Sequence, residues 1–132
     1  KVLTGFNQML AGDFRQTIER FLAIQAMGSE HARDDIRQLR HWLAERPAPQ
    51  FAALEAGLTL LADIDLREPL RELDLPWLRI YGRLDSLVPK AAIPLLDDLY
   101  PASRSVTLNK ASHAPFISHP DEFIEIVRDF VG

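Results

Sequence analysis

Two short apolar segments that can form β-strands, each followed by a polar loop, constrain the fold of this chain most strongly. The first strand, at 76–82, runs into a loop with the pattern Gly-x-x-Asp-x-x-Val-Pro, which carries Asp85. The second, at 104–108, precedes a loop that carries His113. A helical pattern at 90–100 lies between them, and such alternation is typical of a parallel sheet. We therefore expect the carboxyl ends of two parallel strands to bring Asp85 and His113 to one edge.

The first half of the chain has a different pattern. From 1 to about 62 the apolar residues recur at helical spacing, and β-branched runs are lacking. We expect a short helix at 2–10, a second helix that begins after Asp13 and stops at Gly28, a third with Ser29 as its N-cap, and a fourth at about 50–62. The stripes expected to face inward are Phe14, Ile18, Phe21, Leu22 and Gln25 in the second helix, Ile36, Leu39 and Leu43 in the third, and Phe123, Ile126, Val127 and Phe130 in a last helix at 120–131.

The fold expected is therefore α/β, with an all-helical region at 1–62 and an α/β region at 63–132. Two strands alone are marginal in water, and parallel strands usually have both faces covered. Because the sequence also starts at Lys1 and enters a helical pattern at once, we expect it to be a fragment whose missing N-terminal half is a partner.

Composition excludes several classes of protein. The net charge of −4, with no basic cluster among exposed aromatics, argues against nucleic-acid binding. No apolar run is long enough to span a membrane, and no signal-peptide pattern is present. The absence of cysteine excludes disulfides and thiolate chemistry and is consistent with a cytoplasmic protein. We therefore expect a cytoplasmic protein with no membrane partner.

Asp85 and His113 together form a possible base-and-orienter unit. A carboxylate that accepts the Nδ1 proton of an imidazole fixes its tautomer, so that Nε2 can take a proton from a nucleophile. Taken singly, Asp85 could instead cap a turn, and His113 could be a structural or solvated loop residue. The order of the two residues on consecutive strand ends favours the catalytic interpretation.

Three longer motifs carry a family resemblance. The segments Gly82–Pro89, Lys110–Pro120 and Glu19–Gly28 resemble the C-terminal half of the pimeloyl-[acyl-carrier protein] methyl ester esterases, the BioH-type carboxylesterases of biotin synthesis. The resemblance runs over essentially the whole chain. It implies the C-terminal portion of an α/β-hydrolase fold, with the last two parallel strands and their helices at 63–132, preceded by a helical cap at 1–62.

The resemblance also implies roles for individual residues. Asp85 and His113 would be the acid and base of a catalytic triad. The acyl channel would be lined by Phe21, Leu22, Ala23, Ile24 and Gln25. Docking of an acyl carrier protein would use Arg20, Arg33 and Arg37. Helix packing is the alternative for the apolar residues, and a solvated face with local ion pairs is the alternative for the arginines.

Metal and cofactor chemistry are not expected. His31, His41 and His119 show no recognised metal-ligand spacing, so we predict no metal site and no cofactor. The nucleophile is also missing, because none of the serines lies in a Gly-x-Ser-x-Gly elbow. We expect a serine carboxylesterase as the parent protein and an inactive isolated chain. The alternatives are another capped α/β-hydrolase (lactonase, C–C hydrolase or dehalogenase), a non-catalytic binding protein of the same fold, or another doubly wound domain.

Overall fold

The computed structural model describes Met9 and residues 12–132, so the helix expected at 2–10 lies outside the described residues except for Met9. The described helices are α2 (Phe14–Ala26), α3 (Ala32–Ala44), α4 (Phe51–Asp63), α5 (Arg67–Arg71), α6 (Ala92–Leu99), α7 (Pro115–Ser118) and α8 (Pro120–Val131), and the strands are β1 (Leu78–Gly82) and β2 (Arg104–Leu108). The order of elements agrees with the predicted change from helices to alternating strands and helices. The short helices α5 and α7 were not predicted.

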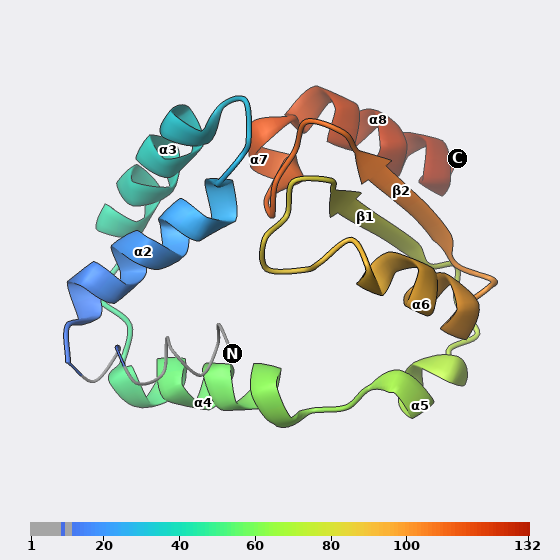
Figure 1. Cartoon of the computed structure of the whole chain (residues 1–132), viewed down its shortest axis with the longest axis horizontal. Coiled ribbons are helices and arrows are strands. Elements are labelled where there is room, and N and C mark those ends of the chain that lie inside the picture. Colours follow the sequence, from blue (N-terminus) through green and yellow to red (C-terminus); the bar gives the residue numbers. More distant parts are fainter. Residues whose placement is uncertain (1–8, 10–11) are drawn as a thin grey trace.

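The two strands form a parallel pair, as predicted. Leu78 lies opposite Arg104 and Gly82 lies opposite Leu108. Figure 1 shows α6 and α8 on opposite sides of this pair, and both strands point toward α7 and the turn between α2 and α3. The loops that follow the two strands therefore emerge beside the helical half of the chain.

Helix α2 begins and ends where the sequence predicts. Its N-cap is Asp13, whose side chain accepts a hydrogen bond from the Gln16 amide at 2.9 Å. Two residues after the helix, Gly28 adopts φ +86°, a left-handed conformation that favours glycine. Leu22 and Ala26 are buried on one side of the helix, and α3 packs against it.

The prediction for the start of α3 is wrong in one respect. The N-cap position is His31 rather than Ser29. Ser29 instead shapes the preceding turn, because its hydroxyl accepts the His31 amide at 3.3 Å and donates to the buried Asp35 carboxylate at 3.1 Å. Phe14 and Leu43, at the far ends of their predicted apolar stripes, are 37% and 50% exposed, because the buried residues Ala26 and Asp35 lie near the opposite ends of the two helices, beside the α2–α3 turn.

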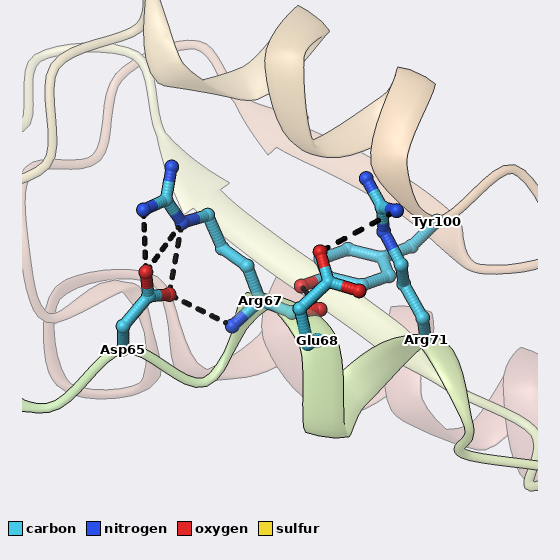
Figure 2. A network of polar contacts seen from close by, with 5 residues as sticks. All are labelled: Asp65, Arg67, Glu68, Arg71 and Tyr100. Carbon is cyan, nitrogen blue, oxygen red and sulfur yellow. Dashed lines mark hydrogen bonds and ion pairs between the residues drawn. The ribbon is translucent and has the colours of Figure 1, made fainter.

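The segment between the helical half and β1 is attached to the end of α6 (Figure 2). The Asp65 carboxylate accepts hydrogen bonds from the Arg67 backbone at 3.0 Å and from its guanidinium, and these bonds hold the pKa of Asp65 well below its usual range. Glu68 pairs with Arg71 at 3.4 Å. The Tyr100 hydroxyl donates to the Arg67 carbonyl at 2.9 Å, which ties α5 to the residue after α6.

A buried arginine joins α6 to the strand pair. The Arg79 guanidinium, on β1, donates to Asp97 of α6 at 2.6 Å, to the Tyr81 hydroxyl at 3.0 Å and to the Ser103 hydroxyl at 3.0 Å. Burial alone would lower the pKa of Arg79, but the hydrogen bonds and charges of Asp97 and Tyr81 outweigh it and raise the pKa. This network fixes α6, which follows the Asp85 loop, against β1.

Much apolar surface stays exposed on the helices. The side chains of Phe51, Leu60 and Leu61 on α4, and of Ile124 and Val131 on α8, are at least 43% exposed. Within the part of the chain that the structure describes, no helix has the length and apolar character needed to cross a bilayer. Exposed apolar faces of this size favour packing against further protein.

Candidate active site

Asp85 and His113 meet at the carboxyl ends of the two strands, as the sequence predicts. His113 Nδ1 lies 2.9 Å from Asp85 Oδ2. The aspartate side chain is only 6% exposed, whereas the histidine side chain is 35% exposed. A buried carboxylate thus holds one side of an imidazole that remains accessible from the other.

The loop after β1 gives Asp85 two tasks. Its backbone amide donates to the Gly82 carbonyl at 3.1 Å, which closes the turn. Its Oδ1 accepts the amides of Leu87 at 2.7 Å and Val88 at 3.0 Å, while Oδ2 bonds to His113. The turn-capping and catalytic interpretations of Asp85 are therefore compatible, because the capping bonds orient the oxygen that faces the imidazole.

Gly82 allows the two loops to approach each other. A Cβ atom at this position would lie 1.9 Å from the Ser112 carbonyl oxygen and 2.6 Å from that of Ala111. The same loop is held by the Leu84 amide, which donates to the Ala111 carbonyl at 3.0 Å. The distance between Asp85 and His113 therefore depends on a residue without a side chain at the end of β1.

The end of α2 supports the histidine loop from the other side. The His113 amide donates to the Gln25 carbonyl at 3.1 Å, and the Ser112 hydroxyl donates to the Met27 carbonyl at 3.0 Å. Gly28 lies against Leu84, where even an added Cβ would remain at 3.5 Å. The predicted base is thus positioned jointly by the strand pair and by the helical half.

This arrangement can accept and relay a proton. With the Nδ1 proton donated to Asp85, the lone pair of His113 Nε2 is available to a hydroxyl group, and the carboxylate stabilises the imidazolium that forms. The motif that carries the attacking serine is not found in these residues, because the 132-residue sequence has no Gly-x-Ser-x-Gly elbow.

The five residues predicted to line an acyl channel lie in different surroundings. Phe21 lines an apolar groove of about 480 Å³ between α2 and α4. Gln25 lines a small cavity with Asp35 and Ser112. Leu22 is buried, Ala23 is exposed, and Ile24 is half-buried. Within the described chain, Phe21 is the member of the set that faces the larger apolar space.

The predicted docking arginines lie on the exposed sides of α2 and α3. Arg37 pairs with Asp34 at 2.7 Å, and both side chains are largely exposed. Arg20 Nη1 lies 3.6 Å from Met9 Sδ. Arg33 is exposed one turn before Arg37. All three arginines are therefore exposed, and Arg37 already forms one of the local ion pairs of the alternative interpretation.

Sequence reasoning missed two polar groups beside this site. Asp35 is buried, and burial raises its pKa although the Ser29 hydrogen bond opposes the shift. The ligand atoms of Glu30, His31 and His119 all lie within 4.8 Å of one another. No sequence signal reveals this second group, because His119 comes from a segment far from the other two in the chain.

Several known proteins are similar in sequence to this chain. No family model matches it. The chain is 86% identical over 132 residues to the pimeloyl-[acyl-carrier protein] methyl ester esterase of Aeromonas salmonicida (strain A449), and 83% identical to that of Aeromonas hydrophila subsp. hydrophila. Each of the two alignments covers 100% of this chain and 52% of the relative. The chain therefore spans about half the length of the curated relatives it matches. The predicted resemblance to these esterases is confirmed.

A Klebsiella pneumoniae esterase of the same name is 53% identical over 125 residues, which cover 95% of this chain and 49% of the relative. Among solved structures, a bromoperoxidase from Bacillus anthracis superposes with a TM-score of 0.81 at 20% identity, over 98% of this chain and 48% of that protein. An E-2-(acetamidomethylene)succinate hydrolase superposes with a TM-score of 0.66 at 23% identity, over 88% of this chain and 44% of that protein. The chain has part of an α/β-hydrolase fold, as predicted.

Proposed function

We propose that this chain supplies the acid and base of a serine carboxylesterase that hydrolyses the methyl ester of pimeloyl-[acyl-carrier protein]. The observation that carries the proposal is the 2.9 Å pair of His113 and Asp85 on consecutive parallel strand ends. The identity of 86% to an esterase of that name supports the choice of substrate. The absence of cysteine suits the cytoplasm, which we propose as the compartment.

In the proposed reaction a serine hydroxyl, contributed from outside these 132 residues, attacks the methyl ester carbonyl. His113 Nε2 takes the hydroxyl proton and returns it to the departing methanol, while Asp85 orients the ring. A water molecule then attacks the acyl-serine and gives its proton to the same nitrogen. The bond between the acyl group and the serine oxygen then breaks, His113 returns the proton to that oxygen, and the acid is released. The cycle uses no metal ion and no cofactor.

The helical half would bind the substrate. Phe21 and its neighbours in α2 would form one wall of the acyl channel, and the hydrogen bond from the His113 amide to the Gln25 carbonyl supports this by holding α2 beside the base. The exposed guanidinium groups of Arg20, Arg33 and Arg37 would contact the acidic carrier protein, because guanidinium groups pair well with carboxylates and phosphates.

The test uses the full-length protein that includes these residues. A fluorophosphonate probe should label one serine outside this chain, and methanol release from pimeloyl-[acyl-carrier protein] methyl ester should be lost in His113→Ala. A small p-nitrophenyl ester, assayed in parallel, separates chemistry from carrier recognition. Hydrolysis of both substrates at the normal rate by His113→Ala would contradict the proposal.

A further inference from the structure

Glu30, His31 and His119 form a group of metal-ligand side chains distinct from the proposed catalytic pair. Glu30 and His31 lie in the turn between α2 and α3, and His119 lies between α7 and α8. Their ligand atoms all lie within 4.8 Å of one another, and the rings of His31 and His119 are 5.7 Å apart between centroids. Two segments that are remote in sequence thus present two imidazoles and one carboxylate to a common point.

The Ser118 hydroxyl contacts the His119 ring. Its oxygen lies 2.8 Å from His119 Nδ1 and 3.3 Å from the Ala114 carbonyl oxygen. When the hydroxyl donates to Ala114, it can accept the Nδ1 proton, and Nε2 of His119 then carries the lone pair that a metal ion requires. Among the described residues, this nitrogen is the buried side-chain atom that lacks a hydrogen-bond partner. A buried polar nitrogen without a partner is costly, and in the tautomer with Nδ1 protonated a cation would satisfy it.

The backbones at His31 and His119 are held in place. The His31 carbonyl accepts the amides of Asp34 at 2.9 Å and Asp35 at 3.0 Å, and its own amide bonds to Ser29. The His119 amide donates to the Pro115 carbonyl at 2.9 Å. The backbone at each histidine is therefore fixed by its own turn, and side-chain rotation would adjust the ligands.

We propose that Glu30, His31 and His119 bind a Zn²⁺ ion that links the α2–α3 turn to the α7–α8 junction. Two imidazole nitrogens and one carboxylate oxygen are a donor set that zinc accepts, with water as the fourth ligand. Bonds of about 2 Å in a tetrahedron place donor atoms about 3.3 Å apart. The ligand atoms, which lie within 4.8 Å of one another, must therefore approach by up to about 1.5 Å. The exposed side chains of Glu30 and His31 can make this movement, and Ser118 supplies the outer hydrogen bond that orients a metal-bound histidine.

Lys110 contacts one of the three proposed ligands. Its ammonium group lies 3.0 Å from the Glu30 carboxylate, and both side chains are exposed. Zinc would displace the Lys110 ammonium, so Lys110→Ala should bind zinc at least as tightly as the natural protein.

The test is calorimetric titration of the chelator-treated full-length protein with zinc chloride, with stoichiometry checked by native mass spectrometry. We expect one zinc per chain at this site. His31→Ala and His119→Ala should each weaken binding at least tenfold, and Ser118→Ala should weaken it about 10- to 100-fold through loss of the orienting bond. His41→Ala is the matched control, because His41 is an exposed α3 histidine paired with Glu45 and outside the group.

Circular dichroism of each variant checks that it is folded, and the small-ester assay shows whether the proposed catalytic pair is intact. Cobalt substitution should give a four-coordinate absorption spectrum that is lost in His119→Ala. Absence of zinc binding, or equal affinity in His119→Ala and His41→Ala, would overturn the proposal. Loss of zinc binding in His113→Ala but not in His119→Ala would place the ion at the catalytic pair and would also overturn it.

Discussion

Replacing Gly82 by alanine should separate the two loops that carry the proposed acid and base. The added Cβ would lie 1.9 Å from the Ser112 carbonyl oxygen, and neither atom can move unless the backbone moves. No side-chain rotation can relieve this contact. The Ser112 loop is also held in place, because its hydroxyl bonds to the Met27 carbonyl at 3.0 Å and the neighbouring Ala111 carbonyl accepts from Leu84.

The size of the effect follows from these distances. Cβ contacts shorter than 3.0 Å are essentially never seen, so one loop must move by about 1 Å. Such a movement would extend the 2.9 Å contact between His113 and Asp85 to nearly 4 Å and remove the hydrogen bond. A displacement of about 1 Å in a catalytic group costs about 100-fold in rate. Overpacking should also lower the free energy of unfolding by about 1–3 kcal/mol.

The assay compares kcat for a p-nitrophenyl ester and the urea midpoint of Gly82→Ala with those of the natural full-length protein. Gly12→Ala is the control, because a Cβ there would lie at an ordinary 3.7 Å from the Met9 carbonyl oxygen. If Gly82→Ala keeps a kcat within twofold of Gly12→Ala, the argument that close packing of these loops positions the catalytic pair is wrong.

Three further predictions concern pH, carrier recognition and the chain alone. Burial raises the pKa of Asp35, so folding stability should fall as the pH rises from the ordinary aspartate value through the raised one. Asp35→Asn lacks this titration, so the urea midpoint of the variant minus that of the natural protein should be higher at about pH 7 than at about pH 4. A difference that does not change with pH would contradict this prediction. The double variant Arg33→Glu and Arg37→Glu should raise KM for the carrier-bound ester about tenfold or more and leave the p-nitrophenyl ester unchanged, whereas Arg128→Glu on α8 should alter neither. The isolated 132-residue chain should hydrolyse no p-nitrophenyl ester above the buffer rate.

The sequence predicts those parts of the fold that depend on local pattern. The strand at 104–108 and the helix at 120–131 have the predicted bounds, because their apolar period and flanking residues agree. Asp13 was identified as a cap from its position before an apolar stripe. The pairing of Asp85 with His113 was also predictable, since parallel strand ends share one edge.

Features that depend on tertiary contacts could not be read from the pattern. Serine is a residue type that favours the N-cap position, but the Ser29 hydroxyl bonds to the buried Asp35. Helix α3 begins two residues later than it would if Ser29 were the cap. The close passage of the Ser112 carbonyl over Gly82 is likewise set by the approach of two separate loops. The same holds for His119, whose meeting with Glu30 depends on how α7 and α8 pack beside the α2–α3 turn.

A double-variant cycle on Asp85 and His113 in the full-length protein tests the central claim most directly. The measured quantity is kcat/KM for a p-nitrophenyl ester in Asp85→Asn, in His113→Ala and in the combined variant. Because the two residues would act as one unit, we expect each single change to cost on the order of 10³- to 10⁴-fold, and the double variant to be no slower than the slower single variant. Losses that multiply in the double variant, or normal activity in His113→Ala, would contradict the account.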